Sequence, residues 1–352
     1  MILIDELLTF ATEQGASDIH ITSGIPPVLR IHKELVYIES EPLTSQDTAE
    51  MIFSIMTDKQ REKFKKELEA DFSYSIPGVA RFRVNAFYQR GSIAAAFRRI
   101  PFKIPSLDSL GVPEIAHQII QYERGFVLVT GPTGHGKSTT LAAMIDEINA
   151  NKSVHILTVE DPIEYLFEHK RSVIVQREIG SDTLTFPNAL RSALREDPDV
   201  LLVGEMRDYE TIATALTAAE TGHLVFATLH TNSAAQSIDR IVDVFPPHQQ
   251  EQVKTQLSSV LLAVFSQQLI PRADKNGLVL ATEVLIATPA VRNLIREGKS
   301  FMIPSIIQMN ADKGMQTMET ALVFLVNKGL ITYEQGLQYS FNKENFINLM
   351  GR

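Results

Sequence analysis

Residues 126–150 read FVLVTGPTGHGKSTTLAAMIDEINA, and this stretch decides the fold. Its centre, residues 131–138, fits the pattern G-x-x-x-x-G-K-S. An apolar strand, Phe126–Thr130, directly precedes the centre, and a helical run, Thr139–Ala150, directly follows it. In a phosphate-binding loop of this kind, backbone N–H groups and the positive end of the helix face the anion. A chance glycine-rich turn is the alternative, and the flanking strand and helix argue against it.

The side chains of this loop indicate a nucleoside triphosphate with Mg²⁺. Lys137 is expected to bridge the β- and γ-phosphates, and Ser138 is expected to hold Mg²⁺. His135 is an unusual occupant, which we interpret as a tolerated exposed side chain rather than a catalytic one. The predicted nucleotide-binding residues are Gly131, Pro132, Thr133, Gly134, His135, Gly136, Lys137, Ser138 and Thr139.

The rest of the chain after residue 113 has the pattern of an α/β domain. Short, wholly apolar runs alternate with helical stretches, and these runs are FVLVT, HILTV, VLLVG and LVFATL. Strands buried on both faces have this composition, which predicts a parallel sheet with helices on each side. The part from about residue 290 is mostly helical. Its four methionines, Met302, Met309, Met315 and Met318, are expected to form a core rather than a docking groove.

The first hundred residues predict a separate, smaller α+β unit. Residues 18–21 alternate polar and apolar, and two long strands follow at about 80–89 and 93–100. The segment 101–113 contains three prolines and a glycine, which is typical of a linker. The predicted domains are therefore 1–100, a linker at 101–113, and 114–352.

Composition excludes several classes of protein. The 352 residues are 44% hydrophobic and 21% charged, so a folded protein is expected. Lys and Arg number 33 against 42 Asp and Glu, a formal charge of −9, which argues against a chain that mainly coats nucleic acid. The absence of cysteine excludes disulfides, zinc–thiolate sites and thiol nucleophiles. No apolar run approaches the roughly 20 residues of a membrane span, and the acidic N-terminus is unlike a secretory signal.

Acidic residues follow two of the predicted parallel strands, where such sheets bind ligands. Strand 155–159 leads into Glu160, Asp161 and Glu164, and strand 200–203 leads into Glu205. One carboxylate is needed for Mg²⁺ or its waters and another to orient the attacking water. Glu205 is the expected metal-side acid, acting through a water, and Glu164 is the best candidate for polarising water. Loop capping or an ion pair remains the alternative for Glu160 and Asp161.

Histidines and arginines complete the candidate site. His230 ends strand 224–229, where it is placed to sense the γ-phosphate, and His223 opens that strand; a structural role is the alternative for both. Cations that stabilise phosphoryl transfer are expected from two pairs. Arg191 and Arg195 are four apart and predicted to share one helix face. If the 80–100 hairpin turns at residues 90–91, Arg83 lies opposite Arg98, an unfavourable pairing unless an anion lies between them. A solvated basic strand face is the alternative.

These motifs together resemble the secretion-type (type II/IV) hexameric ATPases, and in particular the type IV pilus retraction motors. The resemblance runs nearly end to end. Two residues depart from the pattern of these motors. Val291 replaces the usual isoleucine in AVRNLIREGK, the segment that resembles the retraction motif, and His135 replaces the usual serine of the phosphate loop. The matching segments are GASDIHITSGIPPVLRI, ARFRVNAF, GPTGHGKSTT, VEDPIEY, LVGEMRD, TAAETGHLVFATLHT, AVRNLIREGK and GMQTMETAL.

The resemblance implies a PAS-like first domain and a RecA-like P-loop ATPase domain with C-terminal helices. It implies a homohexamer that binds ATP/ADP and Mg²⁺ between the two domains of a chain. Such a motor would be cytoplasmic and peripheral at the inner-membrane pilus machine, with an inner-membrane platform protein (PilC-like) and possibly an accessory retraction ATPase as partners. On this resemblance, the functional residues are Glu164 (catalytic), Glu205 (Walker B), Arg83 and Arg98 (phosphate contacts), Arg191 and Arg195 (near the nucleotide), and His223 and His230 (histidine box).

The predicted function is therefore an ATP-hydrolysing motor for type IV pilus retraction. An accessory retraction ATPase is one alternative. A pilus-assembly or type II secretion ATPase is another, and those usually have an extra N-terminal domain and a four-cysteine zinc site. A non-hydrolysing scaffold would be expected to lack Lys137, Glu164 or Glu205, all of which are present. A nucleic-acid translocase would require a basic channel, which the acidic balance disfavours.

Overall fold

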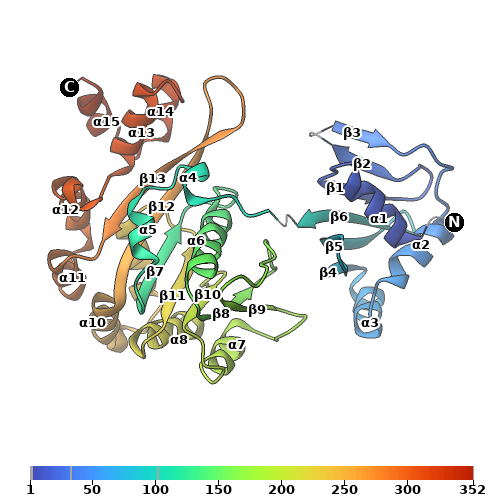
Figure 1. Cartoon of the computed structure of the whole chain (residues 1–352), viewed down its shortest axis with the longest axis horizontal. Coiled ribbons are helices and arrows are strands. Elements are labelled where there is room, and N and C mark those ends of the chain that lie inside the picture. The colour runs from blue at the N-terminus through green and yellow to red at the C-terminus, as the bar shows by residue number, and fades with distance from the viewer. Residues whose placement is uncertain (1–2, 32–33, 101–102, 352) are drawn as a thin grey trace. The chain divides into compact units, whose positions relative to one another are not determined.

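The structure is a computed structural model that describes residues 3–31, 34–100 and 103–351. The chain divides into two compact units, one of residues 1–103 with 164–166 and one of residues 104–163 with 167–352 (Figure 1). The expected linker at 101–113 falls at this division. Its residues from Ile104 onward belong to the second unit, where Leu107 and Val112 are buried in the core.

The first unit is an antiparallel sheet with strand order β3-β2-β1-β6-β5-β4, together with three helices (Figure 1). The core of this unit consists of the alternate, inward-facing residues of the strands and the apolar faces of the helices. Its elements are α1 (Ile4–Glu13), β1 (Asp18–Ile21), β2 (Val28–Ile31), β3 (Glu34–Tyr37), α2 (Ser45–Ser54), α3 (Asp58–Glu67), β4 (Glu69–Ile76), β5 (Ala80–Gln89) and β6 (Ser92–Ile100).

The β5–β6 hairpin turns where the sequence predicts. Arg90 and Gly91 have φ of 51° and 79°, the left-handed values of a tight two-residue hairpin turn. Gln89 pairs with Ser92, so the register places Arg83 directly opposite Arg98. The predicted pairing of these two arginines is confirmed.

The second unit contains a mixed sheet with strand order β13-β12-β7-β11-β10-β8-β9. All neighbouring strands are parallel except β12 and β13. The elements up to the last strand are α4 (Leu107–Leu110), α5 (Ile115–Ile119), β7 (Gly125–Thr130), α6 (Lys137–Asn151), β8 (His155–Glu160), β9 (Val173–Glu178), α7 (Phe186–Ala193), β10 (Val200–Val203), α8 (Tyr209–Glu220), β11 (Leu224–Leu229), α9 (Ala234–Asp243), η1 (Pro247–Gln249), α10 (Gln250–Val260), β12 (Leu261–Pro271) and β13 (Leu278–Ile286).

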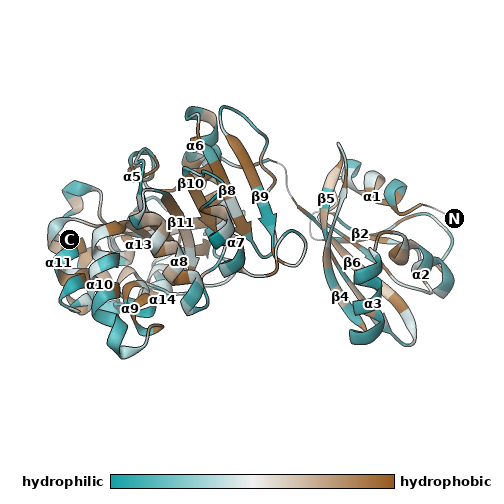
Figure 2. Cartoon of the chain, turned by 90° about the horizontal axis from the view of Figure 1, so that it is seen from below, coloured by the Kyte–Doolittle hydropathy of each residue, from teal (hydrophilic) through white to brown (hydrophobic). Residues whose placement is uncertain are grey.

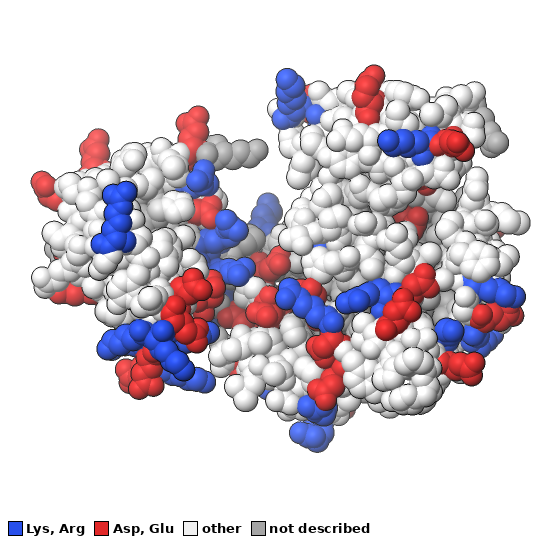
Figure 3. Space-filling model, turned by 180° about the vertical axis from the view of Figure 1, so that it is seen from behind, with Lys and Arg blue, Asp and Glu red and all other residues white. Residues whose placement is uncertain are grey.

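The central strands of this sheet are buried on both faces. Every residue of β7, β10 and β11 is buried, and β10 and β11 are drawn largely in the brown of hydrophobic residues in Figure 2. Separate apolar cores lie on the two sides of the sheet. On the face drawn in Figure 3, acidic and basic side chains of this unit lie interspersed. Within the described residues, no helix is long and apolar enough to cross a membrane.

The C-terminal part is helical, as expected. Its helices are α11 (Pro289–Arg296), η2 (Ser300–Met302), α12 (Ile303–Met309), η3 (Ala311–Lys313), α13 (Met318–Asn327), α14 (Tyr333–Tyr339) and α15 (Lys343–Met350). The core prediction for the methionines is right for Met315 and Met318, which are 2% and 0% exposed. It is wrong for Met302 and Met309, which are 43% and 77% exposed because they end short segments whose apolar side is occupied by Ile303 and Ile307.

Candidate nucleotide-binding site

Four parallel strands of the second unit end at one edge of the sheet, and the candidate residues follow them. Leu229 of β11 pairs with Thr130 of β7, while Val203 of β10 pairs with Ala227 of β11 and with Val159 of β8. The phosphate loop, His230, Glu205 and Glu160 therefore meet at the carboxyl edge, which is where open α/β sheets bind ligands.

The phosphate loop is shaped by its packing against β12. A Cβ atom at Gly131 would lie 2.5 Å from the carbonyl oxygen of Gln267, so only glycine fits this position. Gly136 has φ of 80° and forms the N-cap of α6, so the amino end of that helix faces the loop. Lys137 is 8% exposed, and its Nζ donates to the carbonyls of Gly131 and Pro132 at 2.8 and 2.9 Å.

His135 links the loop to the neighbouring strand. Its Nδ1 accepts a hydrogen bond from the backbone N–H of Leu269 in β12 at 3.0 Å. Burial and the charge of Lys137 lower the pKa of His135, so the ring is neutral at pH 7 and Nδ1 can accept. The interpretation of His135 as an exposed side chain is wrong, because the ring is half-buried and holds the loop against β12.

Glu205 lies at the centre of a polar cluster. Its carboxylate accepts from Arg207, with Nε 2.6 Å and Nη2 2.7 Å from its oxygens, and lies 3.0 Å from Nε2 of His230. The other ring nitrogen of His230 lies 3.3 Å from the hydroxyl of Thr133 in the phosphate loop. His230 therefore bridges the phosphate loop and Glu205, which is the position predicted for a residue that responds to a terminal phosphate.

The charge state of Glu205 suits a role beside a cation. Burial alone would raise its pKa, but the hydrogen bond from Arg207 and the charges of His230, Arg207 and Lys137 outweigh that effect and lower the pKa. Glu205 is thus an anion at neutral pH.

Ser138 and Glu205 fit a magnesium ion that is shared with phosphates. They offer hydroxyl and carboxylate oxygens, which are the ligand types that Mg²⁺ prefers. Among residues 3–31, 34–100 and 103–351, no group of three or more His, Cys, Asp or Glu is placed to hold a metal ion.

The acids that follow β8 differ from one another. Glu160 is 8% exposed and accepts from the hydroxyl of Thr158 at 2.7 Å and from Gln176 at 3.3 Å, which fits the structural alternative for this residue. Asp161 and Glu164 are exposed. Residues 164–166 are grouped with the first unit rather than with the phosphate loop, so the role of Glu164 stays a prediction.

The second arginine pair is arranged differently from the prediction. Helix α7 ends at Ala193, and Arg195 lies in the turn that follows, where its N–H donates to the carbonyl of Ser192. The prediction that Arg191 and Arg195 share a helix face is therefore wrong, because the helix is too short to include both. Arg191 is exposed, donates to the side chain of Asn188 at 2.8 Å and lies 3.9 Å from Glu210.

His223 lies at the other end of β11 from His230. The six residues of β11 separate them, which corresponds to roughly 20 Å. The Nδ1 atom of His223 lies 2.9 Å from the carbonyl oxygen of Ala218 at the end of α8. Within the second unit the structure therefore brings His230, but not His223, to the phosphate loop.

The two candidate arginines of the first unit, Arg83 and Arg98, are exposed and lie directly opposite each other on β5 and β6. Arg98 pairs with Asp18, with Nε 2.9 Å from Oδ1, and Asp18 also lies opposite Arg30 in the register of β1 and β2. Burial would raise the pKa of Asp18, but hydrogen bonds from Arg98 and Ser17 outweigh burial and lower it. Within the described residues, Arg83 forms no ion pair or hydrogen bond through its side chain.

Sequence reasoning missed two residues of these clusters. Arg207 follows Glu205 by two positions within the LVGEMRD segment, so a signal was available. Asp18 is separated from Arg98 by 80 positions, and only the pairing of β1 with β6 reveals the contact.

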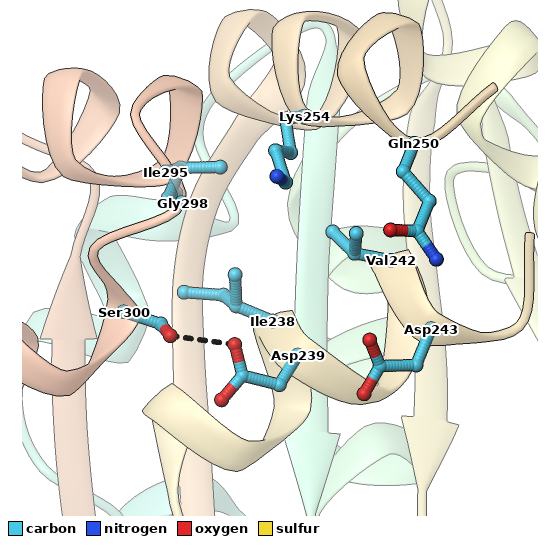
Figure 4. A pocket seen from close by; sticks show the side chains of 9 residues that line it. All are labelled: Ile238, Asp239, Val242, Asp243, Gln250, Lys254, Ile295, Gly298 and Ser300. Atoms are coloured by element: carbon cyan, nitrogen blue, oxygen red, sulfur yellow. Dashed lines mark hydrogen bonds between the residues drawn. The ribbon is translucent and has the colours of Figure 1, made fainter. Parts of the chain in front are cut away.

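A separate open cavity of about 160 Å³ lies between α9, α10 and the end of α11 (Figure 4). Lys254 points into it from α10, facing Asp239 and Asp243 of α9, and Asp239 accepts from the hydroxyl of Ser300 at 2.5 Å. Ile295 and Gly298, which belong to the segment resembling the retraction motif, line its other side. This cavity does not include any residue of the phosphate loop.

The fold and the site define a P-loop nucleotide-binding protein of the α/β class. A family model described as "Type II/IV secretion system protein" matches residues 1–332. The chain therefore belongs to the type II/IV secretion system protein family.

Within this family, the chain is similar to proteins of pilus retraction and twitching motility. The chain is 53% identical to the type IV pilus retraction ATPase PilT of Pseudomonas aeruginosa, over 97% of this chain and 99% of that protein. It is 52% identical to a twitching motility protein of Neisseria gonorrhoeae, over 94% and 90% of the two chains. A crystal structure of the pilus retraction motor PilT with bound ADP is similar, with a TM-score of 0.91 and 51% identity over 99% of this chain and all of that one.

These similarities confirm the predicted fold class, the predicted family and the predicted enzyme class. The fold class, with an N-terminal α+β domain and a P-loop ATPase domain, matches the solved structure. The resemblance to the retraction motors and the assignment as an ATP-hydrolysing enzyme of that kind agree with the relatives. Nucleotide binding is consistent with the ADP in the similar structure.

Proposed function

We propose that this chain is a motor that hydrolyses ATP to power the retraction of type IV pili, by removing pilin subunits from the base of the fibre. The proposal rests mainly on one observation: Thr133, His230 and Glu205 form a continuous polar chain from the phosphate loop to the acid of the neighbouring strand. The near full-length identity to a pilus retraction ATPase supports the choice of process.

The residues of the second unit suit phosphoryl transfer to water. The loop N–H groups and Lys137 would bind the phosphates, and Ser138 and Glu205 would hold Mg²⁺, which when bound neutralises the developing charge. On ATP binding, Lys137 would exchange the carbonyls of Gly131 and Pro132 for phosphate oxygens. His230 would respond to the terminal phosphate through Thr133 and Glu205, and Glu164 would polarise the attacking water.

The arginines would supply the remaining positive charge. Arg83 and Arg98 of the first unit, with Arg191 and Arg195 of the second, would stabilise the charge that develops on the phosphates. His223, at the far end of β11, keeps the histidine-box role that the resemblance implies. We expect the active form to be a homohexamer that hydrolyses ATP, as the resemblance to the retraction motors implies.

The motor would work in the cytoplasm, peripheral to the inner membrane. Its partners would be the inner-membrane pilus platform protein and an accessory retraction ATPase, and no nucleic acid is expected. The domain limits 1–100, 101–113 and 114–352 remain part of this proposal.

The decisive experiment compares wild type with Glu164→Gln in ATPase assays and by mass in solution. The wild type should be a hexamer that hydrolyses ATP, and the variant should bind ATP with unchanged affinity but lose turnover by about a hundredfold or more, because the amide cannot accept the water proton. Glu168→Gln, also exposed and four residues further along the chain, is the matched control and should retain wild-type turnover.

Two results would count against the proposal. Wild-type turnover in Glu164→Gln would remove this residue from the role of base. A monomer at all concentrations, with and without nucleotide, would contradict the ring.

A further inference from the structure

A buried glutamate outside the nucleotide cluster lies where two helices begin. Glu283 is in β13, is 7% exposed, and pairs in register with Ser266 of β12. One of its carboxylate oxygens accepts the backbone N–H of Ala234 at 2.8 Å, and the carboxylate also accepts the N–H of Met318. Ala234 and Met318 are the first residues of α9 and α13, which are ten residues long each.

The first N–H groups of a helix have no partner within the helix, and the helix end bears a partial positive charge. Glu283 supplies one anionic acceptor to two such ends. The side chains of Ser233 and Thr317 accept the N–H groups of Gln236 and Thr320 further along each helix, so Glu283 adds to these caps rather than replacing them. The starts of α9 and α13 are thus held on one side chain.

This carboxylate is connected to the phosphate site on the side of α9. The first residue of α9 follows His230 by four positions. The hydroxyl of Thr231 lies 2.7 Å from that of Ser237 in α9, and Ser237 donates to Thr130 at 3.4 Å, one residue before the phosphate loop. Thr130, Ser266 and Glu283 form one row across β7, β12 and β13, so all of these groups lie on one face of the sheet.

On the side of α13, the carboxylate is connected to the C-terminal helices. Met318 is fully buried in the core that α13 forms with Leu322 and Phe346. Glu319, in the first turn of α13 and 6% exposed, accepts from Asn342 at 2.9 Å before α15. The two hydrogen bonds that Glu283 accepts therefore connect the turn that contains His230 with the packing of the C-terminal helices.

The charge on Glu283 is finely balanced. Burial raises its pKa to about 7, the two backbone N–H groups act in the opposite direction, and the charge of Glu319 raises it further. Glu319 is the charged group that faces Glu283 from α13, whereas α9 and β12 present Ala234 and Ser266, which do not titrate. Above about pH 7 the carboxylate is an anion that accepts both N–H groups, and below that pH it is protonated and accepts them less well.

We propose that Glu283 is a positioning residue of the ATPase, which ties the start of α9 to the start of α13 and thereby sets the placement of the His230 turn. This inference rests on the proposed function, because His230 is assigned its role there. Glu283 lies in β13, outside the predicted nucleotide-binding loop, so it should affect turnover rather than nucleotide affinity.

The test is the pH dependence of turnover in Glu283→Gln. Wild-type kcat should rise with pH through about 7, whereas the variant, which is neutral throughout, should lack this step and have about tenfold lower kcat at pH 8. The KM for ATP should change by less than about twofold, since the phosphate loop is unaltered. Glu283→Asp, which retains the charge, should restore the step in part.

Two further measurements separate positioning from loss of structure. The variant should unfold at pH 8 no more easily than wild type, because a buried acid with a raised pKa destabilises the folded state as the pH rises above its ordinary value of 4.5. Amide hydrogen exchange should nevertheless become faster at the starts of both α9 and α13. Glu319→Gln, the matched control, should retain kcat at pH 8 and shift the step to lower pH.

Wild-type kcat with an unchanged pH profile in Glu283→Gln would overturn the inference and leave the ATPase assignment intact. Unchanged exchange at both helix starts would overturn it as well. If instead wild type shows no turnover, the proposed function fails, and hydrogen exchange still decides whether Glu283 holds the two helices.

Discussion

Lys137 and Arg207, at the phosphate-loop edge of the second unit, have acceptors within that unit, whereas Arg83, on the sheet of the first unit, has no side-chain partner among the described residues. Lys137 donates to two loop carbonyls, and Arg207 donates to Glu205. On the first unit, Arg83 lies directly opposite Arg98, and Asp18 is the acid that pairs with Arg98. Both of those cations thus have acceptors nearby, whereas among the described residues the Arg83–Arg98 pair has Asp18 as its acidic partner, through Arg98.

The difference shows how the two regions are specified. The loop is formed by glycines, a helix end and a strand that are adjacent in sequence, and it packs against Gln267 and Leu269 of β12. Like charges directly opposite on a ribbon destabilise it unless an anion lies between them. The pairing of Arg83 with Arg98 is therefore expected to lower the stability of the first unit and to favour the binding of an anion. No such repulsion is expected in the phosphate loop.

The largest effect is expected from Lys137→Ala in the phosphate loop of the second unit. Removal of the buried ammonium should lower ATP turnover by about a hundredfold or more, because no other loop side chain bears a positive charge toward the phosphates. Turnover and binding of a fluorescent ATP analogue would be measured, with the exposed Lys343→Ala as control. Retention of wild-type turnover would contradict the assigned loop.

In the first unit, Arg83→Ala should lower ATP turnover without lowering the stability of the fold. Turnover should fall about tenfold or more, while the free energy of unfolding should stay equal or rise by up to about 1 kcal/mol, since repulsion from Arg98 is removed. Urea unfolding and ATPase assays would be compared with those of Lys63→Ala, an exposed lysine of α3. A loss of stability in Arg83→Ala would show that the ribbon does not bear unrelieved repulsion.

Asp18→Asn should have a smaller effect, and it should depend on pH. Loss of the ion pair with Arg98 should lower the free energy of unfolding by about 1 kcal/mol at pH 7. Because the folded pKa of Asp18 lies below 3.8, this contribution is present above pH 3.8 and is lost as the pH falls through the folded pKa. Urea unfolding of both proteins between pH 7 and pH 3 measures it; a constant difference across that range would rule out the ion pair as its source.

The smallest effect is expected from His135→Ser, which introduces the residue that the resemblance to the retraction motors implies at this position. The N–H of Leu269 loses its acceptor, at a cost of about 1 kcal/mol, and turnover should change by less than about threefold. Because the folded pKa of His135 is lowered, the stabilisation is present above pH 6.5 and lost as the pH falls through the folded pKa. Thermal unfolding at pH 8 and pH 5 tests this, and a larger difference at pH 5 would refute the neutral acceptor.

Much of the fold could be predicted because the signals are local. Apolar runs define the buried parallel strands, and the two-residue turn at Arg90 and Gly91 sets the register of β5 and β6. Predictions failed where they depended on the exact end of a helix or on the side chain's surroundings in the fold. Helix α7 ends before Arg195, and His135 is packed against a strand more than a hundred residues later in the chain.

Two glutamates illustrate what the sequence specified and what required the tertiary structure. The sequence alone determined the phosphate loop, the strand before Glu205 and the site at the carboxyl edge, because periodicity and glycine spacing act over a few residues. It did not determine the charge of each acid. Arg207 and His230 lower the pKa of Glu205 against the effect of burial, whereas burial and Glu319 raise that of Glu283. The pKa values of these two identical side chains differ because the tertiary structure determines which charges surround each carboxylate and how far water reaches it.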